Sequence, residues 1–362
     1  MDGAVNRIVD LTGVRVLVTG HTGFKGSWLS YWLNILGADV YGYALKPKHQ
    51  NDLFLSLKLD EVLDHMVGDI RDSKSLEDRF RNVKPDLVFH LAAQPLVRQS
   101  YKDPKETFET NISGSVNVLD AVRSTPSVKA LVYVTSDKCY KNVEQNIGYI
   151  ESDQLGGDDP YSASKAAAEI VFAAYRKSFF SGSDAPGLVS VRAGNVIGGG
   201  DWSDDRIIPD CIRSLQNNKA ITIRNPKATR PWQHVLDPLN GYLMVASKLL
   251  NKSGQVSSSY NFGPSANDVH PVEVLVKKVI TNWGSGEVII ESSANNPHEA
   301  ELLQLDSSLA RHELGWSPKW DFATTLSETV RWYYEISRGG DPRKLCHEQI
   351  DLFTSTEVKV SR

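Results

Sequence analysis

Short runs of β-branched and aliphatic residues recur along the first half of the chain, each followed by a stretch with the spacing of an amphipathic helix. Because parallel strands are covered by helices on both faces, such runs are almost continuously apolar. The pattern predicts an α/β fold with a doubly wound, Rossmann-type parallel sheet and a ligand crevice at the carboxyl ends of its strands. The runs are Val14 to Thr19, Val40 to Tyr43, Leu87 to Leu91, Leu131 to Thr135 and Leu188 to Arg192.

The pattern of apolar runs and helical stretches changes after about residue 193. Three glycines stand together at 198–200, and prolines interrupt the helix and strand pieces that follow, which is typical of a smaller, loop-rich domain. A further apolar strand, Ser259 to Phe262, is predicted to return to the main sheet. We therefore expect a Rossmann domain from residues 1–193 that also receives residues 232–263, and an interleaved substrate domain from residues 194–231 and 264–355.

Composition and charge exclude several classes of function. The 362 residues are 41% hydrophobic, which is enough to bury a sizeable core. A formal net charge of -4 gives no basic surface for nucleic acid or a membrane. Three widely spaced cysteines suit a reducing compartment and indicate neither a disulfide framework nor a metal cluster. The N-terminus lacks a signal-peptide pattern and no apolar run reaches the ~18 residues that span a bilayer, so we expect a soluble cytoplasmic protein.

The first apolar run leads directly into a glycine-rich turn, Gly20-His21-Thr22-Gly23-Phe24-Lys25-Gly26, which is followed by a helix-like stretch. Glycines permit a tight turn, let backbone amides approach a pyrophosphate and allow close helix packing, while the helix N-terminus favours the phosphate charge. Between a first strand and a first helix, this turn predicts a dinucleotide site. The expected cofactor contacts here are Gly20, Thr22, Gly23, Phe24, Lys25 and Gly26.

The end of the second strand leaves the choice between NAD and NADP open. The acidic residue that binds the ribose of NAD about 20 positions later is absent from residues 43–48. Lys46 and Lys48 stand there instead, and either face a 2′-phosphate or are solvated loop lysines. After the third strand, Asp69 either binds the adenine amino group or is an ordinary turn carboxylate.

Candidate catalytic residues follow two further strands. Tyr161 and Lys165 are four residues apart in a predicted helix, a spacing that stacks both on one face. For Tyr161 to be half ionised at neutral pH its pKa must fall from ~10 to about 7, and Lys165 with an oxidised nicotinamide would supply charge of the right sign. The strand that ends at Thr135 delivers Ser136-Asp137-Lys138 towards the same crevice.

In their order along the chain, these motifs resemble the extended short-chain dehydrogenase family. Besides the motifs already described, the resemblance rests on Leu91-Ala92-Ala93-Gln94, Asn111 and Arg192-Ala193-Gly194-Asn195, and it covers about 300 residues. Within that family the chain is similar to the sugar-nucleotide 4,6-dehydratases. Three stretches favour the branch that acts on CDP-glucose, namely residues 136–138, 198–202 and 230–234.

The resemblance implies a redox-neutral lyase in which NAD is reduced and reoxidised within one turnover. Tyr161 would take the proton of the glucose 4-hydroxyl, with Ser136 bonded to that oxygen and Lys165 holding the tyrosine and the nicotinamide ribose. Asp137 would protonate the departing 6-hydroxyl, and Lys138 is placed to handle the C5 proton. Because dTDP-glucose dehydratases carry a glutamate at that position, Lys138 serves as the base only where its surroundings favour the neutral amine, and otherwise pairs with Asp137.

Further ligand contacts are expected in both domains. The cofactor would also touch Asp69, Ile70, Leu91, Ala92, Ala93 and Asn111, besides Tyr161 and Lys165. A diphosphate needs forked arginines and amide donors, so Asn195, Arg206 and Arg230 are its candidate ligands. The resemblance places Asn195 and Arg230 near the diphosphate, the strand Ile221 to Arg224 beside the base and Gln94 facing the sugar. His298 and Glu299 are either late pocket residues or part of an ordinary loop. Arg206 follows two aspartates and has an ion-pair role as its alternative. Trp202, Trp232, Trp316 and Cys139 are expected to be packing residues.

The family forms homodimers through a four-helix interface, for which the segments Ile112 to Ser124 and Ala163 to Ser178 are the expected pair, with a tetramer left open. Two other functions use the same fold. A nucleotide-sugar 4-epimerase would leave Asp137 and Lys138 idle, because it returns hydride to C4. A non-catalytic dinucleotide sensor would need neither Tyr161 nor Lys138.

Overall fold

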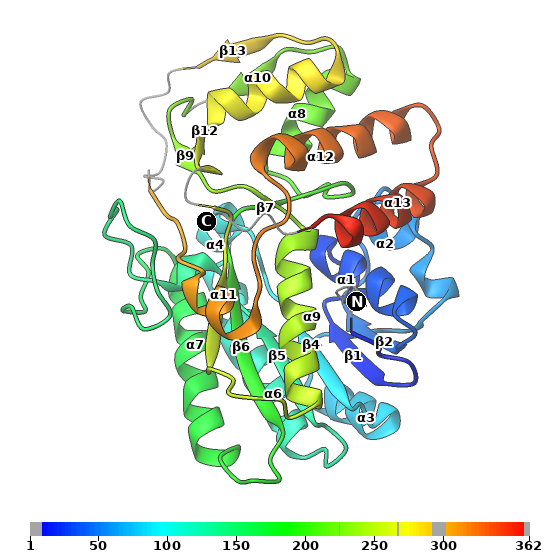
Figure 1. The fold of residues 1–362 in the computed structure, drawn as a ribbon, viewed down its shortest axis with the longest axis vertical. Helices are drawn as coiled ribbons and strands as arrows, with labels where there is room; N and C mark the ends of the chain where they lie inside the picture. The colour runs from blue at the N-terminus through cyan, green and yellow to red at the C-terminus, as the bar shows by residue number, and fades with distance from the viewer. Residues whose placement is uncertain (1–8, 224, 266–267, 292–301, 358–362) are drawn as a thin grey trace, which may run out of the picture.

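A seven-stranded parallel sheet forms the centre of the computed structural model, which describes residues 9–223, 225–265, 268–291 and 302–357 (Figure 1). Its strand order is β11-β6-β5-β4-β1-β2-β3, and every neighbouring pair is parallel. The predicted doubly wound α/β fold is therefore confirmed, as is the return of the late strand to the main sheet. The strands are β1 (Arg15–Thr19), β2 (Asp39–Ala44), β3 (Asp64–Val67), β4 (Leu87–His90), β5 (Ala130–Val134), β6 (Gly187–Ala193) and β11 (Ser259–Phe262).

Helices cover both faces of this sheet because its strands are apolar on both sides. In β1, Val16 and Val18 pack into one hydrophobic cluster with α1 (Phe24–Ile35) and α9 (Leu236–Leu250). Leu17 points the other way, into a second cluster. That cluster includes residues of α3 (Ser73–Val83), α6 (Ser115–Arg123) and α7 (Pro160–Phe179).

Short elements connect the sheet strands, and a second group of elements lies beyond the carboxyl end of β6. The connecting elements are α2 (Leu53–Ser56), η1 (Leu59–Glu61), α4 (Val97–Lys102), α5 (Pro104–Phe108), the π-helical turn η2 (Glu109–Gly114) and the 3-10 turn η3 (Asp137–Cys139). The second group pairs β7 (Val196–Ile197) with β10 (Gln233–His234), β8 (Ile221–Ile223) with β13 (Val288–Ile290), and β9 (Thr229–Arg230) with β12 (His270–Pro271). Its helices are α8 (Ile207–Gln216), α10 (Val272–Trp283) and α12 (Phe322–Ser337). Of the two remaining helices, α11 (Ser308–Leu314) packs against α9 and β11, and α13 (Pro342–Ser355) packs against α1 and α12.

Figure 1 shows α8, α10 and α12 gathered at one end of the molecule, beyond the main sheet. The expectation that Trp202, Trp232 and Trp316 serve as packing residues is confirmed. Trp232 and Trp316 are fully buried, and the Trp232 ring lies 6.1 Å from the Phe322 ring. Trp202 packs edge-on against Tyr333, with ring centroids 5.1 Å apart.

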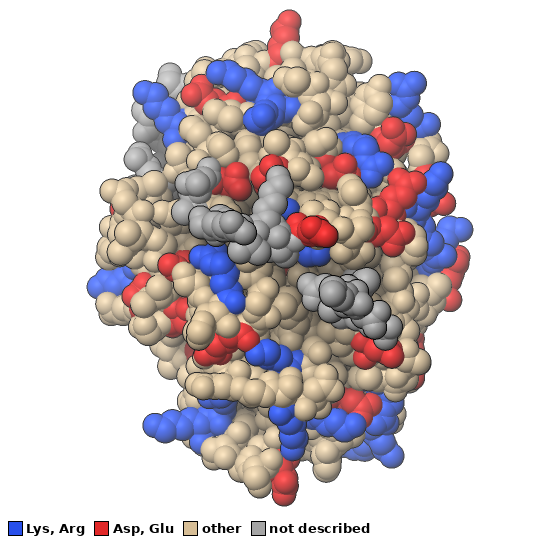
Figure 2. Space-filling view, in the orientation of Figure 1, with Lys and Arg blue, Asp and Glu red and all other residues tan. Residues whose placement is uncertain are grey.

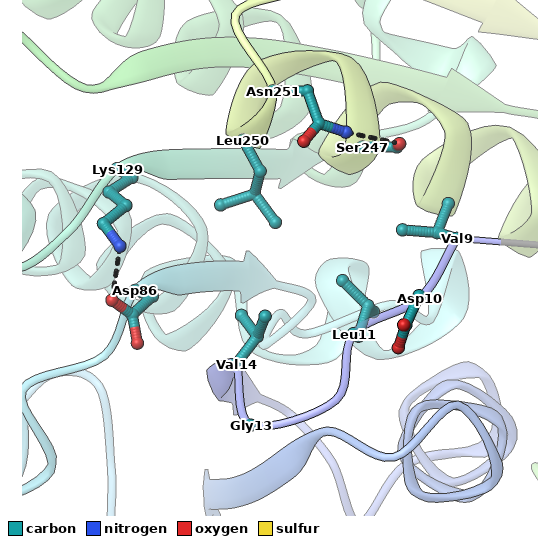
Figure 3. A pocket seen from close by; sticks show the side chains of 10 residues that line it. All are labelled: Val9, Asp10, Leu11, Gly13, Val14, Asp86, Lys129, Ser247, Leu250 and Asn251. Carbon is teal, nitrogen blue, oxygen red and sulfur yellow. Dashed lines mark hydrogen bonds and ion pairs between the residues drawn. The ribbon is translucent and has the colours of Figure 1, made fainter.

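A pocket of about 270 Å³ lies at the amino ends of the sheet strands (Figure 3). Val14, Asp86 and Lys129 line it, and each of them stands just before a strand of the sheet. Asp86 is paired there with Lys129 at 3.0 Å and with Arg15 at 2.9 Å. Ligands of parallel sheets bind at the opposite, carboxyl edge, so this pocket is not the candidate active site.

Acidic and basic side chains are intermixed on the face of the molecule shown in Figure 2. Such mixing agrees with the small formal net charge of -4. Within the described part of the chain, none of the helices is both long enough and apolar enough to pass through a lipid bilayer.

Candidate active site

The glycine-rich turn joins β1 to α1 in a backbone path that side chains would block. Gly20 has φ +77°, and a Cβ there would lie 2.7 Å from the backbone nitrogen of Ala92. A Cβ on Gly26 would lie 2.1 Å from the carbonyl oxygen of Gly20. Gly23 is the N-cap of α1 and has no side chain to cap it, so the first amides of the helix stay available to an anion. The turn fits the pyrophosphate of a dinucleotide.

We expect Gly26→Ala to lower the free energy of unfolding by about 1–3 kcal/mol, because the new methyl group would push against backbone rather than a movable side chain. Denaturant unfolding measures the change. Gly23→Ala is the matched control, since its Cβ would lie 3.4 Å from the carbonyl oxygen of Gly20, an ordinary contact distance. Equal stability of the two variants would contradict a packing role for Gly26.

Other predicted cofactor contacts surround this turn. Thr22 Oγ1 donates to the carbonyl of Leu45 at 2.9 Å. Lys25 is half-buried, and burial followed by the charge of Arg206 lowers the pKa of Lys25 to about 8. Ile70 is buried, and Leu91, Ala92 and Ala93 follow β4 next to the turn.

The carboxylate of Asp69 is paired within the protein. Arg71 bonds it at 2.6 Å, and these bonds lower the pKa of Asp69. A contact of Asp69 with adenine therefore remains a prediction that would have to share the carboxylate with Arg71. Lys46 and Lys48 lie exposed after β2.

Asn111 is fully engaged inside the protein. Its amide nitrogen donates to the Gln94 carbonyl at 3.1 Å and to Ser164 Oγ at 2.8 Å, while its amide oxygen accepts from the Gln94 nitrogen at 2.8 Å. Ser164 Oγ in turn donates to the carbonyl of Tyr161 at 2.7 Å. Asn111 thus ties the loop after β4 to the helix that carries the predicted catalytic pair.

That helix, α7, begins where the sequence provides its start signals. Asp159 caps it by accepting from the Ser162 nitrogen at 3.0 Å, and Pro160 occupies the first turn. Tyr161 and Lys165 are 7% and 6% exposed, so the predicted spacing does place both in one buried region. Lys165 Nζ lies 6.0 Å from the centre of the Tyr161 ring.

Ser136 lies at the carboxyl end of β5, where its hydroxyl acts on the Tyr161 side chain and lowers the pKa of the phenol. Burial raises the pKa of Tyr161 to about 12, and the Ser136 hydroxyl and the charge of Arg206 work against that rise. Burial lowers the pKa of Lys165 to about 8, so this amine is mostly cationic at neutral pH. The protein alone therefore does not lower the pKa of Tyr161 towards 7 as the chemistry requires.

Asp137 is 3% exposed and uses only one of its carboxylate oxygens within the protein. Its Oδ1 accepts from Ser136 Oγ at 2.7 Å, whereas Oδ2 is buried and has no hydrogen-bond partner among the described residues. An ideal Cβ on Gly194 would lie 3.1 Å from Oδ2, so glycine leaves the space beside this oxygen. Lys138 is half-buried next to it. Among the described residues, the Asp137 carboxylate is thus hydrogen-bonded by the Ser136 side chain and not by Lys138.

Arg206 approaches the same region from the N-terminus of α8. It bonds Asp201, which is 4% exposed, at 3.0 Å, and its charge acts on both Tyr161 and Lys25. The two aspartates that precede Arg206 in sequence have other partners. Asp205 bonds Arg98 at 2.6 Å, and Asp204 lies 3.7 Å from Arg213. Arg206 is therefore an ion-pair residue, but with Asp201, and its position still suits a substrate anion.

The other residues predicted to contact the substrate are Gln94, Asn195, Arg230 and His298. The Gln94 amide donates to the Leu96 carbonyl at 3.1 Å and to Thr107 Oγ1 at 2.8 Å, so its side chain holds its own loop. Asn195 and Arg230 are half-buried, on the segment after β6 and on β9. His298, Glu299 and residue 224 lie outside the described residues.

Comparisons with known proteins agree with this geometry. The family model described as GDP-mannose 4,6 dehydratase matches residues 17–329. The chain belongs to the GDP-mannose 4,6 dehydratase family. The CDP-glucose 4,6-dehydratase of Salmonella typhimurium is 49% identical over 351 residues, which are 96% of this chain and 98% of that protein. The resemblance to sugar-nucleotide 4,6-dehydratases is therefore confirmed.

Solved structures of similar proteins share the fold. The dTDP-glucose 4,6-dehydratase DesIV from Streptomyces venezuelae, with NAD and TYD bound, has a TM-score of 0.76 and 25% identity, and the match covers 91% of this chain and 100% of that one. The UDP-glucose 4-epimerase of Thermus thermophilus, in complex with NAD, has a TM-score of 0.76 and 25% identity over 88% of this chain and 99% of its own. Fold likeness alone therefore does not separate a dehydratase from an epimerase.

The sequence analysis did not predict two buried carboxylates as site residues. Glu169 stands one helical turn after Lys165, and Asp201 holds Arg206. The position of Glu169, four residues from Lys165, was a signal available in the sequence. Cys139 is fully buried and burial raises the pKa of its thiol well above the ordinary value, which confirms its packing role.

Proposed function

We propose that the chain catalyses the 4,6-dehydration of CDP-glucose to CDP-4-keto-6-deoxyglucose, with NAD as a catalytic cofactor. The observation that carries this proposal is the buried Asp137 carboxylate, whose Oδ2 has no hydrogen-bond partner among the described residues. Asp137 is bonded to Ser136, the neighbour of Tyr161, and is followed in the sequence by Lys138. An acid and a base beside the tyrosine are what elimination of water needs and epimerisation does not. The high identity to the Salmonella typhimurium CDP-glucose 4,6-dehydratase supports the choice of nucleotide and sugar.

The first step is oxidation at C4. NAD, held by the glycine turn and by Tyr161 and Lys165, would supply the acceptor for the C4 hydride and the donor that delivers it to C6. Tyr161 removes the 4-hydroxyl proton, and Ser136 turns its hydroxyl from Asp137 Oδ1 to hydrogen-bond the same oxygen. Since burial raises the pKa of Tyr161, cations must offset the burial; Lys165 and Arg206 supply them from the protein.

The second step is loss of water across C5 and C6. The C4 ketone makes the C5 proton acidic, and Lys138 removes that proton. The same amine gives the proton back to C5 when hydride is delivered to C6, which completes the 4-keto-6-deoxy product. Asp137 Oδ2 protonates the departing 6-hydroxyl, for which it must carry a proton at that stage. Gly194 leaves room for this oxygen to reach the substrate.

The nucleotide sugar is held from the second group of elements. Arg206 and Arg230 supply forked donors for the diphosphate, and Asn195 supplies an amide. Asp201 fixes the Arg206 guanidinium from behind, with a nitrogen–oxygen distance of 3.0 Å. The glycine turn and the free N-terminus of α1 hold the cofactor pyrophosphate.

Incubation of the purified chain with CDP-glucose and a catalytic amount of NAD tests the proposal. A product lighter by one water, with alkaline absorbance of a 4-keto-6-deoxy sugar and no net NADH, is expected. An unchanged mass with inverted C4 would support a 4-epimerase instead. UDP-glucose and dTDP-glucose are the controls for the nucleotide, and no conversion of any of the three would contradict the enzyme assignment.

The same proposal includes a cytoplasmic homodimer. All three cysteines are free and buried, which suits a reducing compartment. The dimer would form through α6 and α7, where Ile170 and Phe179 are 57% and 52% exposed. Such exposed apolar side chains are typical of a subunit interface.

A further inference from the structure

Glu169 is a charged residue buried directly behind the catalytic pair. It is 2% exposed and lies on α7, eight residues after Tyr161 and four after Lys165. Residues at these intervals stack along one face of a helix. The three side chains therefore form a line along α7, with the carboxylate on the far side of the lysine from the tyrosine.

Both carboxylate oxygens of Glu169 are hydrogen-bonded from the sheet. Thr135 Oγ1, at the end of β5, donates to Oε1. Ser190 Oγ and Arg192 Nη2, both on β6, donate to Oε2 at 2.9 and 2.7 Å. Every donor stabilises the charged form of the carboxylate. The structure therefore holds a fixed anion one turn from Lys165.

Arg192 is the counter-ion of this carboxylate and makes two further hydrogen bonds through its other terminal nitrogen. Its Nη1 donates to Tyr140 Oη at 2.6 Å and to the Glu151 carbonyl at 3.0 Å. Burial opposes the charge of Arg192, but Glu169 outweighs burial and the pKa of Arg192 is raised. Glu169 is thus paired with Arg192 on its sheet side, while its charge opposes the effect of burial on the pKa of Lys165.

We propose that Glu169 is a positioning residue that keeps Lys165 protonated while Tyr161 removes the C4 hydroxyl proton. The inference rests on the proposed function, because it assigns a cause to the charge that this chemistry needs. Without an anion nearby, burial would favour the neutral amine of Lys165. The tyrosinate that forms in the reaction would then lose its nearest cation on α7.

The other charges around Lys165 do not replace Glu169. The neighbouring titratable groups are Tyr161 on α7, Cys139 on η3, His90 on β4 and Lys25 on α1. Burial raises the pKa of the Cys139 thiol and lowers the pKa of His90 to about 3, so both are neutral near pH 7. Lys25 is a cation and opposes the charge of Lys165. Glu169 is therefore the strongest influence that raises the pKa of Lys165 against burial.

The test compares the wild-type chain with Glu169→Gln, which keeps the shape of the side chain and removes its charge. In full-length protein labelled with ¹³C-lysine, the Cε signal of Lys165, assigned with Lys165→Met, is titrated with and without NAD. In wild type, burial lowers the pKa of Lys165 to about 8 and Glu169 opposes that effect. Because Glu169→Gln removes the opposing charge, the titration midpoint of Lys165 is expected at a lower pH than in wild type. The rate of NADH formation from CDP-glucose is also measured in a single turnover as a function of pH. In Glu169→Gln the alkaline limb of this pH–rate profile should move to lower pH, and the rate at pH 8 should be roughly tenfold lower than in wild type.

Matched variants separate charge from fold. Glu313→Gln is the control, because Glu313 also accepts hydrogen bonds, from Tyr260 and Ser257, but lies outside this line of α7 residues. It should leave the Lys165 midpoint unchanged. If Glu169→Gln fails to fold because Arg192 is left unpaired, Glu169→Gln/Arg192→Gln removes both charges and gives the same readout. Glu169→Asp keeps the charge, so its Lys165 midpoint should lie between those of Glu169→Gln and wild type.

An unchanged Lys165 midpoint in the folded Gln variants overturns the inference. That outcome would leave the proposed function standing if wild type still converts CDP-glucose. Failure of wild type to convert CDP-glucose would reject the proposed function, while the lysine titration would still decide the role of Glu169.

Discussion

Replacement of Tyr161 by phenylalanine is expected to lower kcat for CDP-glucose by about 100- to 10,000-fold, the range of a lost general base. The phenyl ring fills the same buried space, so folding should be retained. What disappears is the hydroxyl on which Ser136 acts and which takes the C4 proton. Steady-state turnover and the rate of NADH formation in a single turnover should fall together, because oxidation is the first chemical step.

NAD affinity separates this result from a folding defect. Titration of NAD into Tyr161→Phe should give a Kd close to that of wild type. Tyr175→Phe is the control on the same helix, because Tyr175 is half-buried, packs against Phe179 and lies three turns from the site. Weakened NAD binding with a preserved rate of turnover would contradict a role for Tyr161 as the base.

The sheet could be predicted from the sequence because each of its strands is an apolar run between helical stretches. β11, for example, spans Ser259–Phe262 as expected. The glycine turn could be located because its φ and contact requirements exclude side chains at Gly20 and Gly26. The pairing of Tyr161 with Lys165 followed from helix periodicity alone.

Contacts between distant segments could not be predicted in this way. Arg206 follows Asp204 and Asp205 in sequence, yet its partner is Asp201, while Asp205 reaches back to Arg98. These ion pairs depend on how the segment after β7 folds against α4. A single sequence contains no pattern that encodes such a path.

The ionisation states of the site also depend on burial, which the sequence does not state. Spacing indicates that Tyr161 and Lys165 share a helix face, but not that both are almost fully enclosed. Enclosure raises the pKa of the tyrosine and lowers the pKa of the lysine, so each neutral form is favoured. The chemistry therefore requires compensating charges, and Glu169 is the one that the structure adds.

Replacement of Asp137 by asparagine is expected to stop the reaction after oxidation. Asparagine Oδ1 can still accept from Ser136, and its amide nitrogen fits the space beside Gly194, so the site should keep its shape. It cannot protonate the departing 6-hydroxyl. Turnover to the 4-keto-6-deoxy product should fall by about 100- to 10,000-fold, while C4 oxidation continues.

The expected signature of Asp137→Asn is accumulation of reduced cofactor, followed at 340 nm in a single turnover, with no loss of water from the sugar by mass. Tyr161→Phe shows neither NADH nor product, so the two variants separate oxidation from elimination. Deuterium exchange at C5 further resolves the step, because Lys138 would still remove that proton in Asp137→Asn. Loss of NADH formation in Asp137→Asn would mean that Asp137 acts before elimination, through Ser136 and the tyrosine, and would contradict its assignment as the acid at C6.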